Sequence, residues 1–136
     1  MSGAHRGWVG VDLDGTLAQY DGWRHAAHIG APVPLMQQRV IDWLKEGREV
    51  RIFTARIYPI NECVRPEDIL TFQPVTDRDR DAVLALRAIQ AWCLEHFRAV
   101  LPVTNLKDYG MTMLYDDRCV TVEQNTGKII GRPNGN

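Results

Sequence analysis

Residues 8–16 read Trp-Val-Gly-Val-Asp-Leu-Asp-Gly-Thr, an apolar run that ends in an acidic residue and leads into a turn. A short apolar run without polar interruptions is typical of a strand that is buried on both faces of a parallel sheet. Gly15 favours a turn directly after this run. We therefore predict a buried strand over residues 8–11, with Asp12 and Asp14 at its carboxyl end.

The sequence that follows this strand predicts a helix and then a second strand. Pro34 suits the first turn of a helix, apolar residues then recur at helical spacing, and Gly47 marks the stop. An apolar segment over residues 50–53 predicts a strand that ends at Thr54. Two strands joined through a helix indicate a βαβ unit and hence a mostly parallel sheet.

The second half of the chain continues the α/β pattern. Apolar positions at helical spacing predict a helix over residues 81–97. Residues 100–103 predict a third strand, weakened by the proline within it, and residues 111–115 predict a fourth. Two short apolar segments on either side of Asn-Thr-Gly predict a C-terminal β-hairpin over residues 119–130.

Two stretches carry no strong periodic pattern. Residues 18–34 are rich in glycine and proline, which predicts a loop or a minimal flap. Residues 57–79 are broken by three prolines, and we expect a short helix there over residues 66–70. Loops of this length are often functional, but neither stretch is long enough for a full cap domain.

The composition is that of one globular domain covering residues 1–136. Hydrophobic residues make up 45% of the sequence, and the net charge of -1 gives no general attraction to polyanions or membranes. The three cysteines, at positions 63, 93 and 119, are odd in number and far apart, which argues against a disulfide framework and a zinc site. Because we find no apolar leader and no membrane-spanning run, we expect a cytoplasmic protein with no membrane partner.

Polar residues follow the predicted strands at their carboxyl ends. Asp12, Thr54 and Asp116 each come directly after an apolar run, and such ends meet at the edge where open α/β sheets bind ligands. Carboxylates gathered there repel one another, and a hard cation such as Mg²⁺ relieves the repulsion. We predict Mg²⁺ ligands in Asp12, the main-chain carbonyl of Asp14, and Asp116. Asp117 is either a further ligand or a group that orients a bound water.

These residues suit transfer of a phosphoryl group. The Asp12 carboxylate is a candidate nucleophile, and Asp14 is a candidate general acid and base. The Thr54 hydroxyl can hold phosphate oxygens, and Lys107 can offset the charge of the transferred group. Arg56 has two open interpretations: it reaches the substrate phosphate, or it pairs with an acid.

This pattern resembles the haloacid dehalogenase superfamily of phosphatases. Residues 12–17 resemble its first motif and residues 52–54 its second. Lys107 is similar to its third-motif lysine, and Asp116-Asp117 to its fourth motif. In one departure, only a short stretch separates Lys107 from the last strand, where the family often has a helix.

The resemblance implies a Rossmann-like three-layer α/β/α sandwich, with Asp12 as nucleophile, Asp14 as general acid and base, and Mg²⁺ as cofactor. Without a full cap the site is expected to be open, which suits a large substrate or closure by a neighbouring subunit of a homo-oligomer. His25, His28 and Trp23 lie in the predicted flap, and the sequence leaves their roles open.

The sequence therefore predicts an enzyme, a Mg²⁺-dependent phosphomonoester hydrolase. Its expected substrate is a small phosphorylated molecule, such as a nucleotide or another metabolite, and a phosphorylated nucleic-acid end stays open. One alternative is a signalling module that accepts a phosphoryl group on an aspartate. The order of the motifs disfavours it, because the acidic pair comes last here. Another alternative is a catalytically silent protein that binds metal or phosphate on the same fold.

Overall fold

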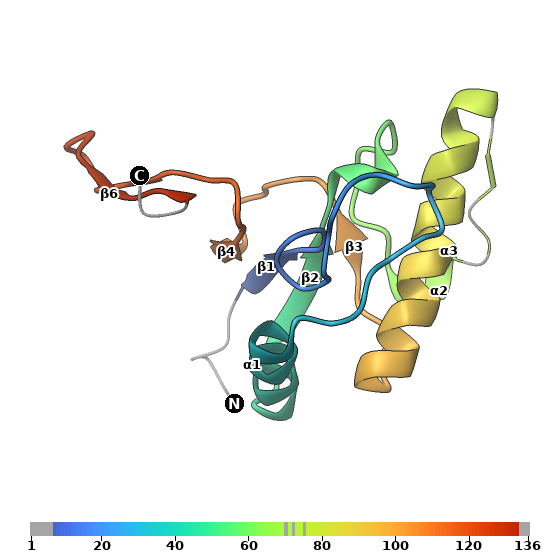
Figure 1. Cartoon of the computed structure of the whole chain (residues 1–136), viewed down its shortest axis with the longest axis horizontal. Helices are drawn as coiled ribbons and strands as arrows, with labels where there is room; N and C mark the ends of the chain where they lie inside the picture. Colours follow the sequence, from blue (N-terminus) through green and yellow to red (C-terminus); the bar gives the residue numbers. More distant parts are fainter. Residues whose placement is uncertain (1–6, 70, 72, 75, 134–136) are drawn as a thin grey trace.

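The computed structural model describes residues 7–69, 71, 73–74 and 76–133. Its centre is a sheet of four parallel strands (Figure 1), which in spatial order are β3 (Val103–Thr104), β2 (Glu49–Phe53), β1 (Trp8–Asp12) and β4 (Met111–Tyr115). A separate antiparallel hairpin contains β5 (Thr121–Val122) and β6 (Ile129–Gly131). The α/β class, the parallel sheet and the C-terminal hairpin predicted from the sequence are confirmed.

The strand register brings the carboxyl ends of three neighbouring strands to one edge. Asp12 pairs with Phe53 of β2, and Val11 pairs with Tyr115 of β4. Residues that follow β2 and β4 in the sequence therefore lie beside the end of β1. The strand register therefore allows residues at the ends of β1 and β4, about 100 positions apart in the sequence, to form one site.

The described residues form the predicted helices α1 (Pro34–Lys45), α2 (Pro66–Ile69) and α3 (Asp77–Phe97), and also a 3₁₀ turn, η2 (Ala55–Ile57), which the sequence did not predict. The predicted start of α1 at Pro34 and the predicted short helix at α2 are confirmed, although residue 70 lies outside the described residues. Helix α3 begins four residues before the prediction. Its first turn carries Asp77 and Asp79, and acidic groups there are favourable beside the exposed N–H groups of a helix start.

Apolar side chains on one face of the sheet form the core. Val9 and Val11 lie opposite Val50 and Ile52, and because side chains alternate along a strand all four project from the same face. They are fully buried in a single cluster with residues of α1 and α3, among them Met36, Val40, Leu86 and Ile89. Both long helices thus cover this face.

The opposite face carries an irregular connection instead of a helix. Residues 105–110, all of them described, link β3 to β4 without helical structure. The Asp108 carboxylate accepts a 2.7 Å bond from the Trp8 indole N–H, and the Arg51 guanidinium stacks over the Trp8 ring at 4.4 Å. This connection lies where the resemblance implies a helical layer.

The third strand is shorter than predicted and lies further along the chain. The sequence predicts it over residues 100–103, whereas β3 covers Val103–Thr104. Pro102 has no N–H to donate to a neighbouring strand, but its carbonyl accepts a 2.9 Å bond from the Ile52 N–H. Regular pairing therefore begins only after the proline.

The predicted flap is a loop between β1 and α1 that reaches across to α3 (Figure 1). The Trp92 indole of α3 donates a 2.9 Å hydrogen bond to the Gly30 carbonyl, which fastens the far side of the flap. At the other end of the molecule, the hairpin extends away from the sheet (Figure 1). Its turn contains Asn125 and Gly127, both with positive φ, a conformation that these residue types tolerate.

Candidate metal centre

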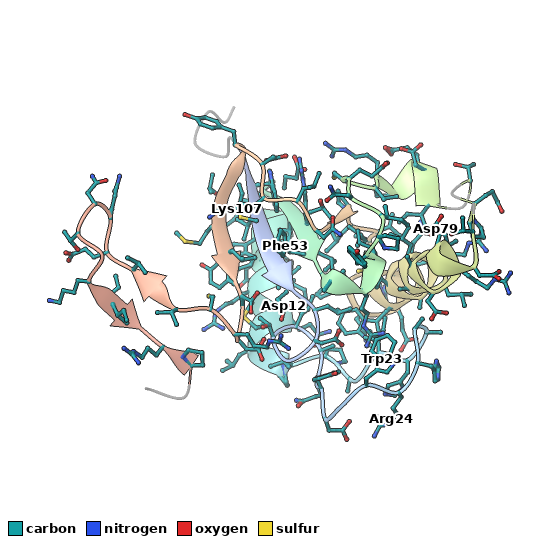
Figure 2. All side chains as sticks on the ribbon, turned by 90° about the horizontal axis from the view of Figure 1, so that it is seen from above. Asp12, Trp23, Arg24, Phe53, Asp79 and Lys107 are labelled. Atoms are coloured by element: carbon teal, nitrogen blue, oxygen red, sulfur yellow. The ribbon has the colours of Figure 1, made fainter. Side chains whose placement is uncertain are left out.

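Three carboxylates meet at the carboxyl edge of the sheet. Asp12 ends β1, and Asp116 and Asp117 directly follow β4. One carboxylate oxygen from each residue lies within 4.8 Å of the other two. Figure 2 shows Asp12 where the β1 arrow ends. The predicted convergence of Asp12, Asp116 and Asp117 is confirmed.

The turn after β1 is shaped to receive Asp117. Gly15 has φ of +88°, and a Cβ at this position would lie 2.5 Å from Asp117 Oδ2. The amide N–H of Leu17 bonds the Asp12 carbonyl at 3.2 Å, which closes the turn. A residue with a side chain would meet both a strained backbone and the carboxylate. Glycine is therefore needed here for close approach as well as for the turn.

Thr16 connects Asp12 of β1 with Asp117 after β4, a role that was not predicted from the sequence. Its hydroxyl oxygen lies 3.2 Å from Asp12 Oδ2 and 3.2 Å from Asp117 Oδ1, and it accepts a 3.0 Å bond from the Asp117 N–H. A hydroxyl has one proton, so it donates to one carboxylate at a time. The signal in the sequence was the place of Thr16 in the turn, four residues after Asp12.

Burial and mutual repulsion disfavour full ionisation of the three carboxyl groups. Burial, a hydrogen bond with Asp117 and the charges of Asp116 and Asp117 together raise the pKa of Asp12 from its ordinary value to about 7, and burial is the largest of these causes. The Thr16 hydroxyl acts in the opposite direction. The donors are all oxygens, as hard cations such as Mg²⁺ prefer, so the three side chains fit a divalent metal.

This charge arrangement predicts how stability depends on pH without metal. The pKa of Asp12 is about 7 in the folded protein and near 3.8 in the unfolded chain, so the folded state binds more protons between these values. The Asp12 contribution to the free energy of unfolding is therefore present below about pH 4 and is lost as the pH rises through about 7.

We expect Mg²⁺ to raise the melting temperature more at pH 8 than at pH 5, because the ligands must be deprotonated. Denaturant unfolding in a chelator, with wild type and Asp12→Asn compared, isolates the Asp12 contribution. If the free energy of unfolding depends on pH equally in the two proteins, the predicted Asp12 contribution is wrong.

Asp14 lies outside the acidic cluster. Its carboxylate forms a two-pronged ion pair with Arg56, with Nε 2.7 Å from Oδ2 and Nη2 2.8 Å from Oδ1. The sequence left two interpretations open for Arg56, and the structure shows the second, pairing with an acid. The main-chain carbonyl of Asp14 as a metal ligand stays a prediction.

The two remaining predicted phosphate ligands lie in different places. Thr54 is buried at the end of β2, and its hydroxyl accepts a 3.1 Å bond from the Arg56 N–H. Lys107 is exposed in the 105–110 connection, and no ion pair joins it to the described carboxylates of the cluster. Its neighbour Asp108 bonds Trp8 at the start of β1, and Figure 2 labels Lys107 apart from Asp12. Both phosphate roles stay predictions.

A cleft of about 450 Å³ opens beside the cluster, toward the hairpin. Its lining contains Asp116, Asp117, Cys119, Thr121, Gly131, Arg132 and Pro133. Arg132 brings a positive charge into this lining, and the sequence analysis did not single it out. Nothing in the local sequence marks it, because only the fold of the hairpin brings it near Asp116.

The flap histidines form no second metal group within the described part of the chain. Arg24 joins His28 to a nearby acid: its guanidinium donates to Asp21 at 3.1 Å and lies 2.9 Å from His28 Nε2. The rings of His25 and His28 meet edge to face at 5.9 Å. These contacts join exposed residues of the flap to one another.

Fold and site together define a small α/β domain with a four-stranded parallel sheet and an acidic group that could hold a metal ion. Comparison with protein-family models, curated proteins and solved structures found no match. Across the described residues, the helices are too short or too polar to cross a bilayer. The parallel sheet and the acidic group are therefore the only basis here for assigning a protein class.

Proposed function

We propose that this protein is a Mg²⁺-dependent phosphomonoester hydrolase of the haloacid dehalogenase type. The observation that carries the proposal is the meeting of Asp12, Asp116 and Asp117, with ligand oxygens within 4.8 Å of one another, at the carboxyl edge of a parallel sheet. The motif order of the sequence, with the Asp-x-Asp-Gly-Thr turn first and the acidic pair last, supports the same family.

In the proposed reaction Asp12 is the nucleophile, and Asp14 is the general acid and then the general base. A bound Mg²⁺ would offset the charge of the carboxylates and of the substrate phosphate. The Asp12 carboxylate attacks phosphorus, an aspartyl-phosphate forms and the ester P–O bond breaks. Asp14 gives its proton to the leaving oxygen. It then takes a proton from the water that attacks the aspartyl-phosphate, which releases inorganic phosphate and restores Asp12.

The two aspartates have different surroundings. Asp12 lies among like charges, whereas Asp14 lies against the Arg56 guanidinium. A catalytically silent metal binder would need only the first of these environments.

The surroundings of the site suit an anionic substrate, which is a small phosphorylated molecule or a phosphorylated nucleic-acid end. The flap is short, and the cleft beside Asp116 and Asp117 is open toward the hairpin, with Arg132 in its lining. A cationic side chain in a cleft next to a metal centre suits an anionic ligand. Closure of this open side by a second subunit is an expectation that stays with the proposal.

The proposal is tested by assaying the purified protein on an aryl phosphate and on a panel of phosphorylated metabolites, with Mg²⁺ and with chelator. We expect turnover that requires the metal. Stable phosphorylation of Asp12 without turnover would instead favour the signalling module. Mg²⁺ binding without hydrolysis of any panel member would favour the silent binding protein.

A further inference from the structure

We propose that Arg56 is a positioning residue for Asp14, not a ligand of the substrate phosphate. The inference rests on the proposed function, since it assigns a partner to the general acid of that reaction. It concerns a pair of side chains that the sequence separates by 42 positions and the fold brings together.

The ion pair has the geometry of a fixed fork. The Nε and Nη2 atoms of Arg56 donate to the two different oxygens of Asp14, at 2.7 and 2.8 Å. Parallel bonds of this kind set the direction of the carboxylate as well as its distance. The Arg56 side chain is only 5% exposed, so solvent does not compete freely for either bond.

The guanidinium has two further contacts, and the Arg56 backbone has one. Its Nη1 donates to the Ala26 carbonyl at 3.1 Å, and its Cζ lies 5.1 Å from the centre of the Trp23 ring. The Arg56 backbone N–H donates to the buried Thr54 hydroxyl at 3.1 Å. Flap, guanidinium and Asp14 thus form one connected unit at the carboxyl edge of the sheet.

This arrangement leaves little of the guanidinium for a substrate phosphate. The Nε and Nη2 fork is occupied by Asp14 and Nη1 is bonded to the flap, so three of the five N–H donors have partners. Arg56 would have to release the general acid in order to bind substrate with the same geometry. Its contacts instead suit a group that orients Asp14 and stabilises the carboxylate left after the proton has been given away.

The two roles predict different dependence on the leaving group. An alkoxide leaves poorly unless it is protonated, whereas nitrophenolate leaves readily without a proton. A positioning residue for the general acid therefore matters for an alkyl phosphate and much less for nitrophenyl phosphate. A phosphate ligand matters equally for both, because both esters carry the same phosphate.

The test compares kcat and KM of Arg56→Gln and Arg56→Lys on a primary alkyl phosphate and on nitrophenyl phosphate, with Mg²⁺ present. We expect Arg56→Gln to lower kcat on the alkyl ester by about 10²-fold or more, and on the nitrophenyl ester by less than about 10-fold. KM should change little on either. Arg56→Lys keeps the charge without the fork and should recover part of the alkyl-ester loss.

Arg51→Gln is the matched control. Arg51 is also buried, bonds Glu49 at 2.6 Å and Asp108 at 3.4 Å, and stacks on an indole ring, but it lies on the face of the sheet that the 105–110 connection covers. Its loss should leave the ratio of alkyl to nitrophenyl activity unchanged. Circular dichroism of each variant separates loss of folding from loss of function.

A second control removes the acid itself. Asp14→Asn should reproduce the leaving-group dependence, and adding Arg56→Gln to it should cost little more, because the two residues act as one unit. An equal loss on both esters, or a rise in KM shared by both, would overturn the inference. A wild-type protein that hydrolyses neither ester would overturn the proposed function instead.

Discussion

Replacement of Asp12 by Asn is expected to abolish Mg²⁺-dependent hydrolysis, with a loss on the order of 10⁴–10⁶-fold, as found when a nucleophile is removed from an enzyme. The amide nitrogen and oxygen are neutral and do not attack phosphorus. The substitution also removes one of the charges clustered with Asp116 and Asp117. Steady-state rates on an aryl phosphate measure the loss, and mass spectrometry of acid-quenched protein should find a phosphorylated peptide in wild type alone.

Two matched aspartate substitutions make the result specific. Asp117→Asn removes a proposed ligand but keeps the nucleophile, so high Mg²⁺ should restore part of its activity, whereas Asp12→Asn should stay inactive at any Mg²⁺ concentration. Asp21→Asn changes an exposed flap residue that bonds Arg24, and it should behave as wild type. Full activity in Asp12→Asn would exclude the covalent route through this residue.

Replacement of Gly15 by Ala is expected to weaken Mg²⁺ binding about 10–100-fold, as is common when support of a metal ligand is lost. The added Cβ would lie 2.5 Å from Asp117 Oδ2 and 3.0 Å from its Cγ. The carboxylate must therefore swing away, and the cluster loses the spacing that suits one cation. The backbone, with φ of +88°, adds a destabilisation of about 1–2 kcal/mol.

Gly47→Ala separates these two effects. Gly47 also has positive φ, at +80°, but a Cβ there would meet nothing within 4 Å. It should lower the melting temperature by a similar amount and leave Mg²⁺ affinity unchanged. Calorimetric titration with Mg²⁺ and thermal unfolding of both variants provide the comparison. If both variants bind Mg²⁺ as wild type does, the close approach of Gly15 to Asp117 has no role in the centre.

Local patterns in the sequence predicted most of the fold. The strand that ends at Asp12, the helix that begins at Pro34 and the strand at 111–115 are all present as expected. Each depends on apolar spacing and on a local start or stop signal. The third strand was placed too early, because its apolar run continues through Pro102, which cannot donate to a neighbour.

The sequence by itself determined that Asp12, Asp116 and Asp117 would meet, since parallel strands bring their carboxyl ends to one edge, Asp12 ends β1, and Asp116 and Asp117 follow β4. Only the tertiary structure decided that Asp14 turns to Arg56 and that Thr16 bridges two acids. Strand order fixes the position of a backbone, but the direction of a side chain beyond a turn depends on the partners that the completed fold supplies.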